Sequence, residues 1–434
     1  MGDIISPRGG TMKGIMLCVL IAMLVLLVPV NVNPNHTFAG NNDNYDDSVL
    51  VVYNASSPES VELKNYYLAN RPRFAQVNSL GITVADVEII SLTSFETDIR
   101  QPIVNWLLAY PKEIRYMVML RGIPSRIIGN YSVDYKMSLA FSDMGIRVGT
   151  PYGGSIGLPF VPSLYPGTTA LVTRLDMGSL AATEAYIDKL ATIYAAVATP
   201  NIIISAGDAA LGGDHYYLDA VRPAGYSVYT MVENDSADLI AANVDPARIT
   251  LEPYGGVHIA TAADVMGYEC WGANGGMGGN YAIDGSVIFS GLSNWHLIKT
   301  MESYNGQRVT WQGNFVDWFS ANAFGGTNYS NTPVGATTHV EEPYTSGVAS
   351  PLYLVDWEKG LLFAECAWDS RNTPYFMAIG DPLVTFNRRS APVQGVGGEV
   401  KSVSKIMVIF PWLTMALVIT AVGILLRSSR RRGS

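Results

Sequence analysis

The chain has 434 residues, of which 48% are hydrophobic and 15% charged, and its net charge is −9. This composition allows a large core and excludes a disordered protein. Between residues 40 and 399 there are 20 basic and 36 acidic residues, so the central part carries −16. A surface this acidic repels phosphate backbones, which excludes nucleic acid as a partner.

Residues 1–39 have the composition of a targeting segment. Lys13 precedes an apolar run that reaches Val30, and Thr37-Phe38-Ala39 forms a small-x-Ala exit. A basic residue, an apolar core and such an exit are the three parts of a secretory signal. The run is also long enough to remain as an uncleaved anchor. The sequence predicts a signal peptide or N-terminal anchor here, and both alternatives stay open.

The other end of the chain predicts a membrane anchor. Residues 406–426 are apolar and long enough to cross a bilayer, and the tail 427–434 contains four arginines. Because basic tails stay on the cytoplasmic side, the main domain is expected outside, on a single-pass membrane protein. Residues 391–405, rich in Gly, Val and Ser, are expected to be a flexible tether.

Between the ends, short apolar runs alternate with amphipathic stretches. This alternation predicts one α/β domain over residues 48–390, with a mostly parallel sheet flanked by helices. The expected strands are 48–53, 87–92, 116–120, 169–175, 201–205, 227–232, 265–268, 286–289 and 376–379, and the stretch 335–344 is expected to begin as a strand. The expected helices are 59–70, 96–108, 179–198, 215–221, 310–323 and 358–368.

The stretch 264–296 contains the best candidates for a site. The expected strand 265–268 leads into Cys270, the strand 286–289 leads into Ser290, and His296 follows six residues later. Ligands of open α/β sheets bind beyond the carboxyl ends of the strands. If these two strands are neighbours, Cys270 or Ser290 as nucleophile and His296 as base would form the catalytic site of a hydrolase.

No cofactor or metal site is expected, because the histidines lack ligand spacing such as HExxH and no phosphate-binding loop is present. Cys270 and Cys366 are the two cysteines of the central domain. In an exported protein they could form a disulfide or remain as buried thiols, and the sequence leaves both alternatives open.

Six motifs occur in an order that resembles a known group of proteins. They are VVYNASSPESVELKNYYLANR, YMVMLRGIP, LVTRLD, GYECWGANGG, GATTHVEEPY and AIGDPLVTF, between residues 51 and 386, and the similarity spans roughly 48–387. Together they resemble an uncharacterised family of exported microbial proteins with GYxSWGSN, EPY and GDPL motifs. More distantly, the order is similar to the gingipain-type cysteine peptidases, which implies a caspase-like sheet.

The resemblance to gingipains also implies where a His/Cys dyad would lie. The two corresponding strand ends hold Cys270-Trp271-Gly272 and Ser290-Gly291, so the dyad of that family is not in place. A second interpretation follows, in which the domain is a catalytically silent module that binds an extracellular glycan or peptide. Aromatic side chains suit such binding. The expected substrate-binding residues are Trp271, Asn274, Trp295, Glu342 and Tyr344.

Overall fold

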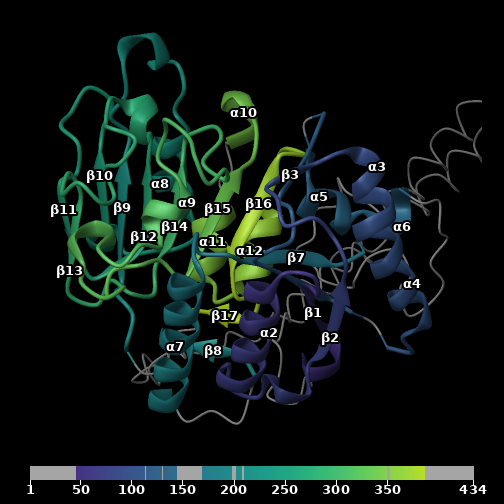
Figure 1. The fold of residues 1–434 in the computed structure, drawn as a ribbon. Helices are drawn as coiled ribbons and strands as arrows, with labels where there is room; N and C mark the ends of the chain where they lie inside the picture. Colours follow the sequence, from purple (N-terminus) through teal and green to yellow (C-terminus); the bar gives the residue numbers. More distant parts are fainter. Residues whose placement is uncertain are drawn as a thin grey trace, which may run out of the picture.

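Ten strands form the central sheet of the computed structural model (Figure 1). The structure describes residues 45–112, 114–129, 131–143, 169–197, 202–207, 210–348 and 352–386. The strand order is β10-β9-β12-β14-β15-β16-β7-β4-β1-β2. These strands are β1 (Val49–Asn54), β2 (Asn78–Ile82), β4 (Tyr116–Leu120), β7 (Leu171–Leu175), β9 (His215–Asp219), β10 (Ile249–Glu252), β12 (Val265–Cys270), β14 (Leu297–Thr300), β15 (Gly335–His339) and β16 (Phe376–Gly380).

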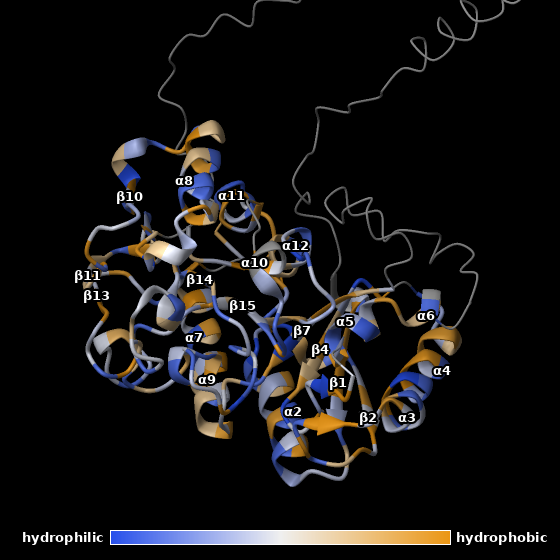
Figure 2. Ribbon diagram, turned by 90° about the horizontal axis from the view of Figure 1, so that it is seen from above, coloured by the Kyte–Doolittle hydropathy of each residue, from blue (hydrophilic) through white to orange (hydrophobic). Residues whose placement is uncertain are grey.

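The central strands are buried on both faces. Every residue of β4, β7, β12, β15 and β16 is buried, as expected for strands covered by helices on each side. Figure 2 shows α2 (Pro58–Asn70) and α7 (Leu180–Val197) on one side of the sheet. On the other side lie α8 (Met231–Ala241), α11 (Leu352–Glu358) and α12 (Phe363–Asp369). The predicted α/β fold with a large, mostly parallel sheet is confirmed at this level.

The sheet has two parallel halves, joined through β16. One half contains β10, β9, β12, β14 and β15, and the other contains β7, β4, β1 and β2. β16 pairs antiparallel with β15, and it meets β7 at the single residue pair Ile379–Arg174, which has parallel register. One pair does not fix how the two halves run, so contacts between the loops at their ends decide it. Asp176, directly after β7, pairs with Arg308 in the loop after β14. Glu341, which follows β15, lies 3.4 Å from Arg126, which follows β4. The carboxyl ends of both halves therefore lie on one edge of the sheet, here called the carboxyl edge.

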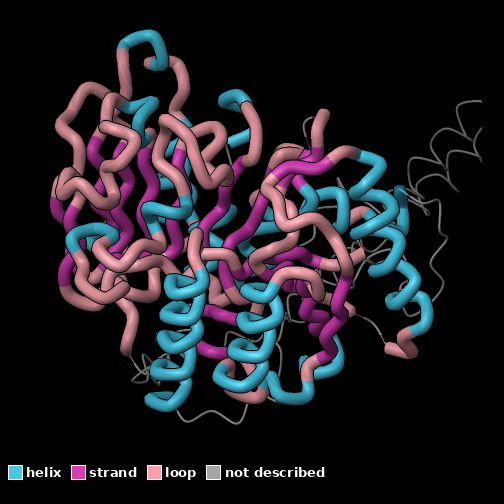
Figure 3. Tube along the Cα trace, viewed as in Figure 1, coloured by secondary structure: helices cyan, strands magenta, loops and turns pink. Residues whose placement is uncertain are grey.

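Short elements surround the main sheet. β11 (Thr261–Ala263) pairs with β13 (Ile288–Ser290), β17 (Val384–Thr385) with β8 (Ile204–Ser205), and β5 (Arg126–Ile127) with β3 (Ile89–Ile90) and β6 (Tyr131–Ser132). The remaining helices are α3 (Leu92–Ser94), α4 (Gln101–Ala109), α5 (Val133–Ser138), α6 (Ala140–Asp143), α9 (Phe315–Trp318) and α10 (Tyr344–Val348), with a π-helical turn at Phe95–Arg100. Figure 3 shows long loops beside the half of the sheet that contains β9, β12 and β14.

Several local predictions are wrong. Residues 310–323 were expected to form one helix, but α9 covers Phe315–Trp318 alone. Residues 215–221 were expected to be helical, but His215–Asp219 is strand β9, and residues 227–232 were expected to be a strand, but α8 begins at Met231. The burial of β9 alternates between half-buried and buried over its first four residues, with a tyrosine at each of its second and third positions. Aromatic residues on a half-buried, pleated surface favour a strand, and this short pattern outweighs the helical one.

The predicted targeting and anchoring segments, 1–39, 391–405, 406–426 and 427–434, lie outside the described residues. Among the helices that the structure describes, none combines the length and apolarity needed to cross a bilayer.

Candidate functional site

Cys270 lies at the carboxyl edge, but its side chain has no access to solvent. It ends β12, opposite Thr300 of β14 and Asp219 of β9, and its side chain is fully buried. Burial, and next the neighbouring carboxylate of Glu302, raise the pKa of the thiol well above its ordinary value. Since the thiolate is the nucleophilic form, this cysteine is inert in the observed conformation. Cys270 and Cys366 are both free and buried, which decides against the disulfide.

His296 lies near the opposite edge of the sheet. It immediately precedes β14, whose Leu297 pairs with Gly267, three residues before Cys270. At about 3.3 Å per residue, His296 is roughly 13 Å along the strands from Cys270. Burial lowers the pKa of His296 to about 3, and its Nδ1 lies 2.8 Å from the Ser293 carbonyl oxygen. The expected Cys270–His296 pair is therefore not assembled.

Ser290 belongs to a different sheet. It ends β13, which pairs with β11 and not with β12, and its hydroxyl donates to the Ala262 carbonyl at 3.3 Å. Its own carbonyl accepts the amide of Asp264, the residue before β12, so Ser290 lies at the amino end of that strand. The expectation that residues 270 and 290 end neighbouring strands is wrong, because β14 takes the place beside β12.

The predicted substrate-binding residues are scattered. Trp271 is buried, and Trp295 is buried near the amino end of β14, with its Nε1 donating to the Thr385 carbonyl at 3.0 Å. Asn274 donates to the Met301 carbonyl at 2.7 Å, and the Glu342 carboxylate accepts the Tyr344 amide at 3.0 Å. Tyr344 is 72% exposed. Trp295 therefore lies at the opposite end of the sheet from the other four, of which two follow β12 and two follow β15.

Glu302 is a buried carboxylate at the carboxyl edge that sequence reasoning missed. Its Oε1 accepts the backbone amides of Ala273 (2.9 Å) and Gly313 (2.8 Å), and Tyr281 donates to its Oε2 at 3.1 Å. Burial raises the pKa of Glu302 to about 7. A Cβ on Gly272 would lie 2.3 Å from this carboxyl carbon, so only glycine fits there. Glu302 thus ties the loops after β12 and β14 together.

A second acidic group at this edge orients a histidine. Asp219 at the end of β9 is buried and accepts the amides of Val221 and Ile259, both at 3.0 Å. His258 Nδ1 lies 3.1 Å from Asp219 Oδ2, and His258 Nε2 lies 3.2 Å from the Gly275 carbonyl. The hydrogen bond to Asp219 raises the pKa of His258. Both ring nitrogens are engaged, so the pair fastens neighbouring loops together.

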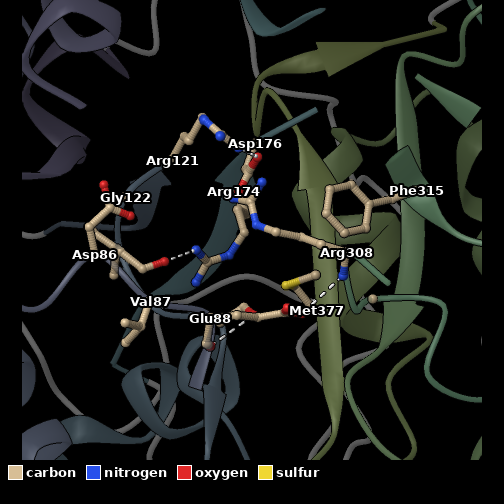
Figure 4. A pocket seen from close by; sticks show the side chains of 13 residues that line it. Asp86, Val87, Glu88, Arg121, Gly122, Arg174, Asp176, Arg308, Phe315 and Met377 are labelled. Carbon is tan, nitrogen blue, oxygen red and sulfur yellow. Dashed lines mark hydrogen bonds and ion pairs between the residues drawn. The ribbon is translucent and has the colours of Figure 1, made fainter. Parts of the chain in front are cut away.

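A polar cavity of about 220 Å³ lies at the carboxyl edge, beyond β4 and β7 (Figure 4). Its walls come from segments far apart in the sequence: the loop after β2, the end of β4, the end of β7, the loop after β14, α9 and the first residues of β16. The lining residues are Asp86, Val87, Glu88, Arg121, Gly122, Ile123, Ser125, Arg174, Asp176, Gly306, Arg308, Phe315 and Met377. We call it the carboxyl-edge cavity.

One wall of the carboxyl-edge cavity is a network of ion pairs. Asp176 pairs with Arg121 at 3.2 Å and also with Arg308, and both guanidiniums donate to the Gly178 carbonyl, at 3.0 and 3.1 Å. Arg121 is further paired with Glu59 at 2.8 Å. Because Asp176 is shared, the network fixes the loop after β14 to the ends of β4 and β7.

Arg174 is buried beneath this network, and its guanidinium group has an ion-pair partner and backbone acceptors. Its Nη2 donates to Asp134 Oδ1 at 2.6 Å and its Nε to Oδ2 at 3.3 Å, while the carbonyls of Ile123 and Pro124 accept from Nη1 and Nη2. Both side chains of the pair are buried. A buried guanidinium needs such partners, so Arg174 supports the floor of the cavity.

Two carboxylates of the cavity are held by neutral donors. Asp86 accepts the Ser57 hydroxyl at 2.6 Å, and Glu88 accepts the backbone amide of Arg308 at 3.0 Å. Among the described residues, no cationic side chain forms an ion pair with either of them. This wall is therefore negatively charged.

Metal binding has no geometric support: within the ranges described, no three His, Cys, Asp or Glu side chains converge in a way that could hold an ion.

Comparisons with known proteins add a single observation on the fold. No protein-family model matches the chain, and no curated protein does. A solved structure titled "Structure of Protease" aligns with it at 10% sequence identity and a TM-score of 0.45, covering 80% of each chain. The class that the coordinates define is a mixed α/β domain with a polar cavity at the carboxyl edge of its sheet.

Proposed function

We propose that this protein is an extracytoplasmic binding module whose ligand occupies the carboxyl-edge cavity. One observation carries the proposal: Asp86, Glu88, Arg121, Asp176 and Arg308 converge on a 220 Å³ cavity from four separate segments. In open α/β sheets, ligands bind at this edge, and pockets with a few convergent polar groups are the usual ligand sites.

The hydrolase hypothesis has less support. It requires an accessible nucleophile beside a base, whereas Cys270 and His296 are buried and lie near opposite ends of their strands. Ser290 is accessible, but its hydroxyl donates to a backbone carbonyl on a separate small sheet. A binding function requires none of these residues to move.

The location and the finer fold type belong to the same proposal. The segments 1–39 and 406–426 favour export and a C-terminal membrane anchor, with the domain facing outwards. The order of the six motifs favours a caspase-like arrangement of the sheet. An extracellular glycan or peptide is then the class of ligand to test.

The test is binding by the full chain in detergent micelles, measured against glycan and peptide libraries by calorimetry. Arg308→Ala removes one guanidinium group from the cavity lining, while Asp176 keeps Arg121 as an ion-pair partner. We expect this variant to lose at least about tenfold in affinity, corresponding to about 1.4 kcal/mol. Lys112→Ala, which removes an exposed lysine paired with Asp47 away from the cavity, is the matched control and should bind normally. Unchanged affinity in Arg308→Ala would refute the proposal.

A further inference from the structure

The carboxyl-edge cavity has room for one small group. Its volume of about 220 Å³ lies below the range of roughly 300–1,000 Å³ typical of pockets that enclose a drug-sized ligand. A ligand larger than this must leave most of its surface outside, against the neighbouring loops. The ligand is therefore expected to insert one end and lie across the surface with the rest.

The cavity offers hydrogen-bond donors and acceptors side by side. Arg121 and Arg308 contribute guanidinium groups, and Asp176 between them contributes carboxylate oxygens. Each of these charges is matched by another, so the wall has strong hydrogen-bonding groups but little net charge. Hydroxyl groups both donate and accept, and adjacent hydroxyls on a ring can satisfy such a wall.

The carboxylates of Asp86 and Glu88 disfavour anionic ligands. Asp86 and Glu88 are the carboxylates of the lining that neutral donors hold, and Arg174 is already matched by Asp134. An incoming carboxylate or sulfate would meet the like charges of Glu88, which is half-buried, and Asp86, which is exposed, and this repulsion costs free energy. The overall acidity of the central domain acts in the same direction.

An exposed tryptophan lies on the segment that forms the cavity wall. Arg308 and Phe315 both line the cavity, so the intervening residues leave it and return. Within this segment Trp311 is 68% exposed and Val309 85%. Gly279 packs directly against the backbone of Trp311, since a Cβ on Gly279 would lie 2.3 Å from the Trp311 carbonyl oxygen. A large aromatic face kept in solvent, three residues from the cavity-lining Arg308, is typical of a binding surface.

From these observations we infer that the ligand is an uncharged glycan: its terminal sugar enters the carboxyl-edge cavity, and an adjoining ring stacks on Trp311. The inference rests on the proposed binding function and deepens it. Sugar hydroxyls satisfy the paired arginines and Asp176, while Asp86 and Glu88 select against uronate, sialylated and sulfated glycans.

The experiment is a glycan array probed with the full chain in detergent micelles, with neutral, uronate-containing and sulfated oligosaccharides and a peptide panel on the same slide. We expect binding to neutral oligosaccharides. Trp311→Ala should weaken it at least about tenfold. Leu108→Ala, at an exposed apolar residue of α4, is the control and should bind as the parent does.

A second variant tests the selection by charge. Glu88→Gln keeps an acceptor for the Arg308 amide but removes one negative charge, so binding of uronate-containing glycans should rise at least about fivefold relative to neutral ones. Glu62→Gln, at an exposed carboxylate on α2 outside the cavity lining, should leave this ratio unchanged.

The outcomes separate the two proposals. Peptide binding that is lost in Arg308→Ala would overturn the glycan inference and leave the binding function intact. A preference for anionic glycans, or full neutral-glycan binding by Trp311→Ala, would also overturn the inference. If every bound probe is unaffected by Arg308→Ala, the proposed function itself fails.

Discussion

Replacing Glu302 by glutamine should remove a large part of the pH dependence of stability. Burial raises the pKa of this carboxyl from 4.5 to about 7 in the folded chain. The folded state therefore holds the proton more tightly than the unfolded state does. The resulting stabilisation is fully present below pH 4.5, is lost as the pH rises towards 7, and is absent above that value.

The magnitude follows from the size of the shift. At 1.36 kcal/mol per pH unit, the change from 4.5 to about 7 corresponds to about 3 kcal/mol. Glutamine is nearly isosteric and its carbonyl oxygen can still accept the amides of Ala273 and Gly313. It does not titrate, so the variant should lack this contribution at every pH.

The assay is urea unfolding of the full chain in detergent micelles at pH 4.5, 5.5, 6.5 and 7.5, followed by tryptophan fluorescence. The difference in free energy of unfolding between the parent and Glu302→Gln isolates this group from the others that titrate. The parent should lose about 3 kcal/mol relative to the variant between pH 4.5 and pH 7.5. Glu62→Gln, at an exposed carboxylate, should follow the parent. A difference that stays constant with pH would refute the reasoning about burial.

Three further predictions concern the core and the sealed thiols. Asp381→Ala leaves the buried guanidinium of Arg71 without its partner at 2.7 Å and should cost about 3–5 kcal/mol in denaturant unfolding; a loss below 1 kcal/mol would contradict the pairing. Gly272→Ala should lower the melting temperature of the domain by several degrees, because its φ is +54° and the new Cβ meets Glu302; an unchanged melting curve would contradict the close approach. A thiol-directed reagent should label Cys270 only after denaturation, as read by peptide mass spectrometry; rapid labelling of the folded chain would reopen the hydrolase hypothesis.

Much of the sheet could be predicted because its strands are buried on both faces. The apolar runs at β1, β4 and β16 are continuous, and the predicted ranges agree with the observed ones to within one residue. The strand β14 was missed because Lys299 interrupts its apolar pattern. This lysine is buried through ion pairs with Asp235 (2.5 Å) and Glu269 (3.0 Å), which a local pattern cannot anticipate.

The same omission explains the errors at the site. Because β14 was not predicted, the run before Ser290 became the next predicted strand after β12. The prediction therefore placed Ser290 beside Cys270. The surroundings of Glu302 also depend on the pairing of β12 with β14. The backbone amides that donate to its carboxylate belong to Ala273, after β12, and Gly313, after β14. Contacts between segments this far apart in the sequence leave no periodic signal.

The residues of the carboxyl-edge cavity did leave a signal in the sequence. Arg174 and Asp176 occur in or directly after an otherwise apolar strand, in the motif LVTRLD. Charged residues are almost never fully buried unless they are paired. A charge in a buried strand therefore indicates a partner elsewhere in the chain, although the sequence does not reveal that Asp134 and Arg308 are those partners.

Hydrogen exchange of the full chain, with and without the tightest-binding neutral oligosaccharide from the array, tests the central claim most directly. If the ligand occupies the carboxyl-edge cavity, amides in residues 84–88 and 303–313 should exchange more slowly in its presence. Protection confined to residues 261–264 and 286–296, around Ser290 and His296, would contradict the account and return the site to the other end of the sheet.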